Sequence, residues 1–87
     1  MKIDVSVKLK RKLKKIKKKD SKLYFRFKLR IKLLEKDVGN PKLKIHKLDG
    51  YGEGVWSFSI TSKIRVLFMF AGKGILLTDL GSHDEVY

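Results

Sequence analysis

The spacing of the apolar residues changes part-way along this chain, and that change constrains its fold more than any other feature. Over residues 6–19 apolar side chains recur every three or four positions, as on one face of a helix. Over residues 55–61 they alternate with other residues, as in a strand with one buried face. The helical set is Val5, Leu9, Leu13 and Ile16, and the alternating set is Trp56, Phe58 and Ile60. Helices in the first half and strands in the second predict an α+β domain.

Two helices are predicted in the first half, one over residues 6–19 and the other over residues 21–38. Ser6 is a suitable N-cap for the first helix, and Asp20 for the second. The second segment also alternates like a strand, but its length of about 17 residues is large for a strand in a small domain and favours a helix. Gly39 is a plausible C-terminal cap for it. The prediction is therefore a helical hairpin.

The remaining elements are predicted to be strands. They are expected over residues 2–5, 55–61, 64–71 and 75–80, with a hairpin turn at residues 71–74. Residues 64–71 are apolar on both faces apart from Arg65, which indicates a central strand covered on both sides. In the strand before it, one side is expected to be buried and the other to be exposed or to line a cleft.

Residues 40–54 are predicted to be a connector. Its glycines Gly50, Gly52 and Gly54 are interpreted as turn residues, because a phosphate-binding loop needs a strand before it and a helix after it. The expected order is β-α-α-β-β-β, with the helices on one face of a mainly antiparallel sheet. A chain of 87 residues has room for one such domain, here residues 1–87.

The positive charge is concentrated in the first half of the chain. The formal net charge is +13; residues 1–48 hold 19 of the 22 Lys and Arg and four of the nine Asp and Glu, a net charge of +15, whereas residues 49–87 carry −2. This asymmetry favours an anionic partner, with nucleic acid first; the alternative is a solvated lysine-rich surface. The predicted RNA or ribosome contacts are Lys8, Lys12, Lys15, Lys19, Lys44, Lys47 and Lys63.

Several functional classes are disfavoured by composition. The chain has no cysteine, so disulfides, thiolate metal sites and cysteine nucleophiles are excluded, which fits a reducing cytoplasm. The start of the chain leads into lysines and has no signal-peptide pattern. The longest apolar run, residues 66–71, is too short to span a bilayer. We expect a cytoplasmic protein with neither cofactor nor metal ion.

The residues suited to proton transfer and phosphate binding are few. His83 and Tyr87 lie in the last eight residues, just after a predicted strand, and imidazole titrates near pH 6.5, in the physiological range. Arg65 suits phosphate binding, the alternative being an ion pair with Asp79 or Glu85. His46 is a second candidate proton carrier, the alternative being a structural role. With many lysines, this set fits RNA cleavage by attack of the 2′-hydroxyl on its own phosphate, which needs no metal.

Four sequence blocks resemble one known family. They are His46-Lys47-Leu48-Asp49-Gly50, Trp56-Ser57-Phe58-Ser59-Ile60, Ile64-Arg65-Val66-Leu67-Phe68 and Leu80-Gly81-Ser82-His83-Asp84-Glu85-Val86-Tyr87. Their order and spacing resemble the RelE/ParE toxin superfamily of type II toxin–antitoxin systems, and most closely its RelE/YafQ-like messenger-RNA endonucleases. The resemblance extends over nearly the whole chain.

This resemblance implies both an activity and partners. The activity is ribosome-dependent, metal-independent cleavage of messenger RNA in the A site, which inhibits translation. The partners are the ribosome, messenger RNA and a cognate antitoxin that blocks the toxin; operator DNA is reached only through the antitoxin, and no membrane is involved.

The resemblance also implies roles for individual residues. His83 matches a histidine of proton transfer, His46 a histidine of an H-x-L-x-G block, Arg65 an arginine that contacts the scissile phosphate, and Tyr87 a near-terminal tyrosine important in RelE-like toxins. A further histidine and an aspartate of YafQ-like members have no match here. Their roles are either absent or taken by Ser59 and Lys63.

Three other functions remain as alternatives. A ParE-like inhibitor of DNA gyrase shares the fold and needs no histidine. A non-catalytic RNA- or ribosome-binding module would bind RNA and leave it uncut. A membrane-surface helix protein is favoured only by the basic amphipathic stretch.

Overall fold

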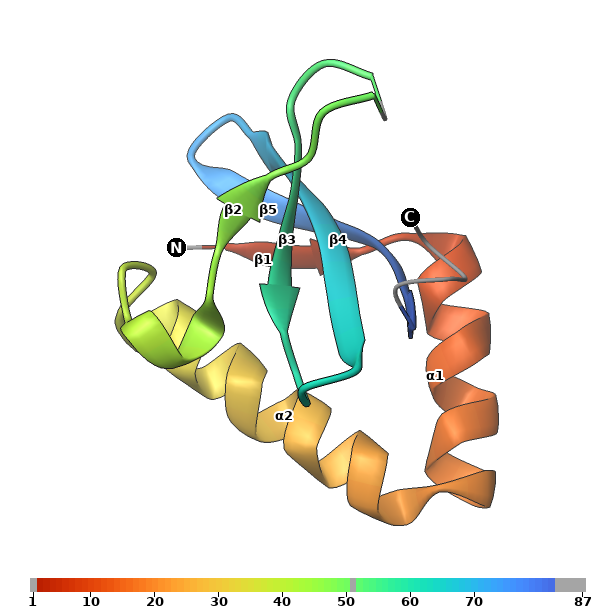
Figure 1. Cartoon of the computed structure of the whole chain (residues 1–87). Coiled ribbons are helices and arrows are strands. Elements are labelled where there is room, and N and C mark those ends of the chain that lie inside the picture. The colour runs from red at the N-terminus through yellow and green to blue at the C-terminus, as the bar shows by residue number, and fades with distance from the viewer. Residues whose placement is uncertain (1, 51, 83–87) are drawn as a thin grey trace.

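The computed structural model describes residues 2–50 and 52–82 as two helices and a five-stranded sheet (Figure 1). The elements are β1 (Ile3–Val5), α1 (Val7–Lys19), α2 (Ser21–Lys36), the short 3₁₀ helix η1 (Pro41–Leu43), β2 (His46–Lys47), β3 (Val55–Ser59), β4 (Ile64–Ala71) and β5 (Gly74–Ser82). The strand order is β1-β5-β4-β3-β2. Only β1, which pairs with β5, is parallel to its neighbour, so the predicted, mainly antiparallel sheet is confirmed.

Polar caps define the predicted helical hairpin. The Ser6 side chain accepts a hydrogen bond from the Leu9 NH and donates one to the Thr78 carbonyl, which ties the start of α1 to β5. Asp20 serves both helices. Its backbone NH donates to the Ile16 carbonyl at the end of α1, and its side chain accepts from the Leu23 NH at the start of α2. One residue therefore joins the two helices.

The ambiguous second segment is a helix, as its length predicted, but it ends two residues earlier than expected. The last helical residue is Lys36, and Asp37 is the C-cap through its NH, which donates to the Leu33 carbonyl. Gly39 lies beyond this cap, so its predicted capping role is wrong. Val38, expected within the helix, is instead exposed.

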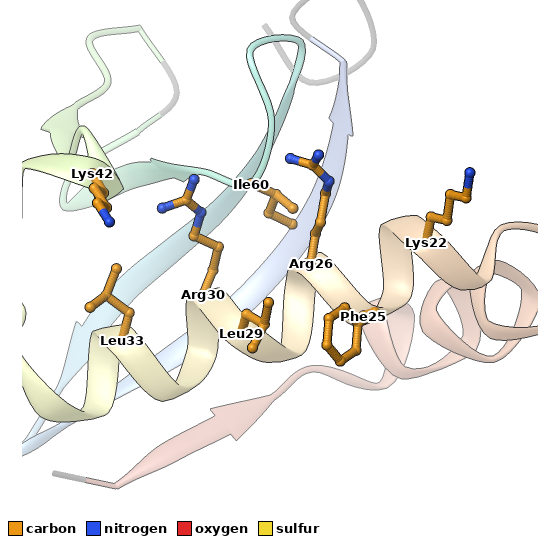
Figure 2. A pocket seen from close by; sticks show the side chains of 8 residues that line it. All are labelled: Lys22, Phe25, Arg26, Leu29, Arg30, Leu33, Lys42 and Ile60. Atoms are coloured by element: carbon orange, nitrogen blue, oxygen red, sulfur yellow. The ribbon is translucent and has the colours of Figure 1, made fainter.

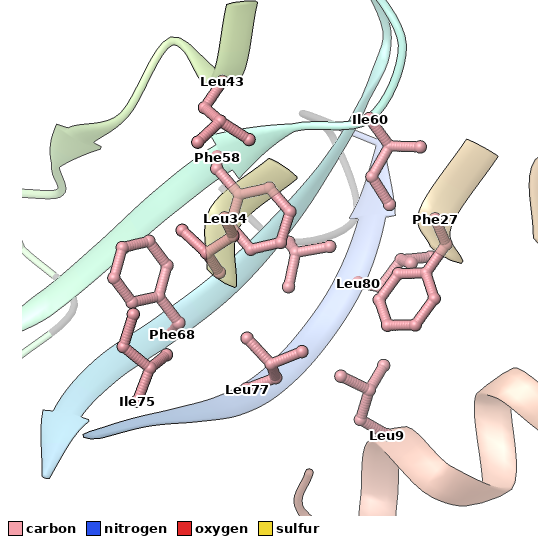
Figure 3. Packing of buried hydrophobic residues seen from close by; sticks show 11 residues of the cluster. Leu9, Phe27, Leu34, Leu43, Phe58, Ile60, Phe68, Ile75, Leu77 and Leu80 are labelled. Carbon is pink, nitrogen blue, oxygen red and sulfur yellow. The ribbon is translucent and has the colours of Figure 1, made fainter. Parts of the chain in front are cut away.

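The core lies between the helices and one face of the sheet (Figure 3). Both helices pack on that same face, as predicted, because one buried cluster joins their side chains to those of β3, β4 and β5. Its members are Leu9, Phe27, Leu34, Leu43, Phe58, Ile60, Val66, Phe68, Ile75, Leu77 and Leu80. A second, smaller cluster of Leu48 and Leu67, with Val55 packed against it, lies apart from the main core.

The connector over residues 40–54 contains a short helix and a short strand that were not predicted from its sequence. Within it, η1 is followed by β2, which pairs antiparallel with β3, so the sheet has five strands instead of the four predicted. The three glycines have φ of 86°, 91° and 75°, which confirms their role as turn residues.

The central strand β4 is covered only in part. Val66, Leu67 and Phe68 are buried, so the predicted cover on both sides holds for this stretch. Met69 and Phe70 are exposed, and there the prediction is wrong because the strand continues beyond its covering layers. A bulge at Thr78 lets Leu67 pair with Asp79 but Phe68 with Leu77, which keeps Leu77 and Leu80 both in the core.

Within residues 2–50 and 52–82, no helix combines the length and apolar character needed to cross a bilayer.

Candidate active site

Arg65 lies on the sheet face that points away from the helices. Side chains alternate along a strand, and the neighbouring Val66 and Phe68 belong to the helix-facing core. Arg65 and Leu67 therefore face the opposite side, where Leu67 packs in the smaller cluster. Three β3 residues share this face, Val55, Ser57 and Ser59; both serines are buried, so the β3 side opposite Trp56 is not an exposed surface.

Hydrogen bonds hold the guanidinium of Arg65 in place. Nε donates to Ser57 Oγ at 2.9 Å, and Nη2 donates to the Lys44 carbonyl at 2.6 Å. Nη2 also lies 3.4 Å from His46 Nδ1, a long contact. A donor fork fixed at two points keeps one orientation, and an arginine side chain carries its charge throughout the physiological pH range.

Local geometry accounts for the acceptor at Lys44. This residue caps η1 and has φ of 47° and ψ of 49°, the left-handed region that only a few per cent of non-glycine residues adopt. The chain then enters β2, where His46 pairs with Ser57. Three short elements, η1, β2 and β3, thus deliver a carbonyl, an imidazole and a hydroxyl to one arginine.

The contact with His46 has a chemical consequence. Arg65 can donate to Nδ1 only when that nitrogen carries no proton. Among the described residues, no hydrogen bond or ion pair engages the remaining nitrogen of Arg65, Nη1. The His46 side chain is exposed at the open edge of the sheet. The fixed guanidinium of Arg65 and the exposed imidazole of His46 therefore lie next to each other.

The other side of Arg65 is formed by β5. Arg65 pairs with Gly81, and Ile64 pairs with Ser82, the residue that precedes His83 in the sequence. The predicted roles of His83 and Tyr87 lie outside the described residues, as does the alternative ion pair with Glu85.

Asp79 binds lysines instead of Arg65, so the other alternative, an Arg65–Asp79 ion pair, is wrong. Its carboxylate lies 2.8 Å from Lys12 Nζ and 3.1 Å from Lys8 Nζ. Burial, the strongest single influence, raises the pKa of the Asp79 carboxyl. Hydrogen bonds from Lys12, from the Leu80 backbone NH and from Lys8 outweigh burial, so the pKa lies below its ordinary value of 3.8.

The lysines predicted to bind RNA fall into two groups, those that bind the end of β5 and those that do not. Lys12 also donates to the Leu80 carbonyl, so it and Lys8 bind the end of β5. The other five are exposed: Lys15 and Lys19 on α1, Lys44 and Lys47 beside His46, and Lys63 in the β3–β4 turn. Lys12 and Lys15 also line a cleft of about 270 Å³ with Ile64 and Gly81.

Two groups of the site, the Ser57 hydroxyl and the Lys44 carbonyl, were not predicted from the sequence. Ser57 was seen only as part of an alternating pattern, and the Lys44 carbonyl carries no side-chain signal at all. Ser59, a possible substitute for a missing role, binds the Thr61 carbonyl at 2.7 Å. No cluster of three or more His, Cys, Asp or Glu suited to a metal ion occurs within the described part of the chain.

Solved structures share this arrangement of strands and helices. A YoeB/ParE toxin from Agrobacterium tumefaciens matches with a TM-score of 0.81 and 18% identity, over 95% of this chain and 99% of that chain. The E. coli DinJ–YafQ complex contains a chain that matches with a TM-score of 0.80 and 16% identity, over 99% and 97%. The chain has the RelE/YafQ-like toxin fold.

The RelE/YafQ-like fold also occurs in the heterotetrameric YoeB–YefM toxin–antitoxin complex from Staphylococcus aureus. That match has a TM-score of 0.77 and 18% identity, over 95% of this chain and 97% of the other. No family model matches the sequence, and a search of curated proteins finds no match. The matches to solved structures confirm the RelE/YafQ-like fold that the four sequence blocks predicted.

Proposed function

We propose that this protein is the toxin of a type II toxin–antitoxin system and that it cleaves messenger RNA on the ribosome. The observation that carries the proposal is the fixed guanidinium of Arg65 beside His46 in a RelE/YafQ-like fold. The solved relatives with this fold include YafQ with DinJ and YoeB with YefM, a toxin–antitoxin complex. By analogy, we propose a cognate antitoxin as the partner and the cytoplasm as the place of action.

In the proposed reaction, the 2′-hydroxyl of the RNA attacks the adjacent phosphorus. A base takes the hydroxyl proton, the bond to the 5′-oxygen breaks, and an acid protonates that leaving oxygen, which yields a 2′,3′-cyclic phosphate. Arg65 Nη1 donates to the phosphate oxygens as charge builds up on them. His83 and His46 serve as the base and the acid of these two proton transfers. Tyr87 positions the substrate, and the lysines bind ribosomal and messenger RNA. The reaction requires no metal ion.

Induction of the chain in cells tests the proposal. We expect growth arrest, with primer extension showing cuts within translated codons. Arg65→Ala and His83→Ala are each expected to slow cleavage by about 10²-fold or more, because each removes a charge-stabilising or proton-transfer group. Arg26→Ala, which removes an exposed arginine of α2 outside the predicted RNA contacts, is the matched control and should stay within about twofold of the parent.

Two results would contradict this assignment. Cleavage that survives both Arg65→Ala and His83→Ala would place the active site elsewhere. Inhibition of DNA gyrase in a supercoiling assay, with messenger RNA left whole, would instead support the ParE-like alternative. RNA binding without any cleavage would support the non-catalytic module.

A further inference from the structure

One aromatic side chain of the sheet lies beyond the cover of the helices. Phe70, near the end of β4, is 53% exposed, although it is on the same face of the strand as the buried Phe68. Trp56 on β3 is half-buried and lies next to it, with the two ring centroids 5.6 Å apart and an angle of 81° between the ring planes. Two neighbouring rings that both reach the surface form a candidate contact patch.

Further ring contacts restrict the orientation of Phe70. Its ring also meets Phe68 edge-on, with centroids 5.5 Å apart and an angle of 79° between the planes. Phe68 in turn packs against Phe58, and both are fully buried in the core (Figure 3). The four rings therefore form a continuous row from the core to the surface. Since the Phe70 ring is already oriented, it loses little conformational entropy when a flat ligand stacks on it.

Two lysines lie on either side of these rings. Lys47 pairs with Trp56 across β2 and β3, so the two side chains are on the same face of the sheet. Lys73 belongs to the β4–β5 turn, three residues after Phe70. Both lysines are exposed, and among the residues that the structure describes no ion pair engages either of them. Their charges are therefore available to an anionic ligand that contacts the rings.

We propose that Phe70 and Trp56 form a stacking platform for an unpaired base of single-stranded RNA, whose flanking phosphates bind Lys47 and Lys73. Proteins commonly hold single-stranded nucleic acid in this way, with bases stacked on aromatic rings and the backbone along a positively charged surface. The net charge of +13 attracts such a polyanion. The β2–β3 connector adds two exposed acidic residues, Asp49 and Glu53, which would repel phosphates and so favour a path over the lysines.

A protein partner fits this patch less well. A docked helix inserts a row of apolar anchors at i, i+3 or i+4, and i+7, whereas the patch offers one exposed ring beside a half-buried one. A second copy of this chain would bring another net charge of +13 to the same place. One ring suits one base, because every base has a π-face. The expected ligand is therefore RNA with little sequence preference, and messenger and ribosomal RNA share this chemistry.

The platform and Arg65 are on opposite faces of the sheet. Phe68 belongs to the helix-facing core and Phe70 shares its face, whereas Arg65 faces away from the helices. RNA on the platform therefore does not occupy the place of the proposed reaction. Binding at this second place requires no cleavage, so the platform does not rest on the proposed function.

The intrinsic fluorescence of the full chain tests the platform, because Trp56 is its only tryptophan. The probe is a 2′-O-methyl RNA of about ten adenosines, which the proposed reaction cannot cut because it has no free 2′-hydroxyl. A chain of the same length with an abasic sugar at every position carries the same phosphates without bases. We expect the adenosine probe to quench the Trp56 emission and to bind at least about tenfold more tightly than the abasic chain.

Matched variants separate stacking from general effects. Phe70→Leu keeps an apolar side chain but removes the ring, and it should weaken binding of a labelled adenosine probe about fivefold or more, measured by fluorescence anisotropy. Phe70→Tyr keeps a ring and should stay within about twofold of the parent. Phe25→Leu makes the same change at another exposed phenylalanine, on α2 (Figure 2), and should also stay within about twofold. Urea denaturation of each variant confirms that it is folded.

The lysines are tested against the same two probes. Lys47→Gln with Lys73→Gln should weaken binding of the adenosine probe and of the abasic chain by similar factors, because the phosphates are common to both. A loss confined to the adenosine probe would contradict the assignment of these lysines to the phosphates.

Three outcomes would overturn the stacking platform. They are equal affinity for the adenosine and abasic probes, an unchanged Trp56 emission at saturation, or a loss from Phe70→Leu no larger than that from Phe25→Leu, as expected if the patch serves a protein partner. Cleavage of unmodified messenger RNA is measured separately. A chain that binds the probes as expected but cuts no RNA refutes the proposed function and not the platform; the opposite pair of results refutes the platform alone.

Discussion

At the scale of single residues, the position of Arg65 depends on the hydroxyl of Ser57. Ser57 is fully buried and accepts from Arg65 Nε at 2.9 Å. We predict that Ser57→Ala lowers the rate of RNA cleavage about tenfold, mainly in kcat, because the guanidinium loses one of its two short anchors. Single-turnover cleavage of an RNA substrate measures this effect.

A double-mutant cycle separates positioning from general damage to the sheet. In an Arg65→Ala background, Ser57→Ala should have no further effect on the rate, since there is no guanidinium left to position. Thr78→Val, which removes a hydroxyl bonded to the Leu67 carbonyl, is the control. Additive losses from Ser57→Ala and Arg65→Ala would rule out a positioning role.

Asp79 gives the folded state a predictable response to acid. Its pKa is lowered in the folded protein, so the unfolded state binds more protons in acid. The stability that Asp79 provides is therefore complete above its ordinary value of 3.8 and is lost as the pH falls through the folded pKa. Between about pH 7 and pH 2.5, the parent should lose up to about 1 kcal/mol more free energy of unfolding than Asp79→Asn does.

Urea denaturation at the two pH values measures this difference. Asp4→Asn removes an exposed carboxylate on β1 for which the described residues show no ion pair, and it should retain the acid response of the parent. An Asp79→Asn protein as sensitive to acid as the parent would show that the contacts with Lys8 and Lys12 provide no stability.

At the scale of elements, the parallel pair β1–β5 requires a glycine. A Cβ added to Gly74 would overlap the backbone carbonyl of Lys2, the carbonyl that accepts from the Ile75 NH at 2.9 Å. Gly74→Ala should therefore push β1 away from β5 and cost about 1–3 kcal/mol in the free energy of unfolding. Chemical denaturation checks this value.

Gly39 offers a matched control for that substitution. A Cβ there would meet only Asp37 Oδ1, at an ordinary contact distance of 3.7 Å. Gly39→Ala should change the free energy of unfolding by less than about 0.5 kcal/mol. Equal losses from the two alanines would mean that close backbone packing at Gly74 is not the cause.

The helical hairpin depends on a single shared cap. Asp20→Ala removes the acceptor of the Leu23 NH and should cost about 1 kcal/mol in the free energy of unfolding, whereas Asp20→Asn keeps an acceptor and should cost much less. Thermal unfolding of the two variants provides the comparison. Equal stability of Asp20→Ala and the parent would show that the cap makes no net contribution.

At the scale of the whole molecule, the charge distribution predicts a strong dependence of RNA binding on salt. Lys15 and Lys19 are exposed on α1, whereas Lys8 and Lys12 bind Asp79. Lys15→Gln with Lys19→Gln should reduce the slope of log K against log salt concentration by about 2, roughly one for each phosphate that the variant no longer neutralises. Filter binding of RNA at several salt concentrations measures the slope.

The control for this experiment replaces two lysines on α2. Lys32→Gln with Lys36→Gln removes two exposed lysines at the same spacing and the same amount of charge. This pair should reduce the slope by less than half as much. Equal slopes for the two double variants would mean that RNA responds to net charge and not to the surface of α1.

Much of the fold could be predicted because its signals are local. The side chains of Ser6 and Asp20 each cap a backbone NH three residues away. The apolar residues of 6–19 recur every three or four positions, which indicates a helix at each turn. The end of α2 could not be predicted as well, because Asp37 caps it before Gly39 is reached. The short strand β2 was missed since two residues, His46 and Lys47, carry no periodicity.

By itself, then, the sequence determined the helices, the main strands and the candidates Arg65 and His46. Only the tertiary structure decided that Arg65 binds Ser57 and the Lys44 carbonyl, eight and 21 residues away in the chain, and that Asp79 binds lysines. It also decided that the strand-like alternation in α2 forms two apolar sides, one buried and one open. Caps and periodicity act over one or two helical turns, whereas these pairings depend on strand register and on how distant segments pack, which no local pattern encodes.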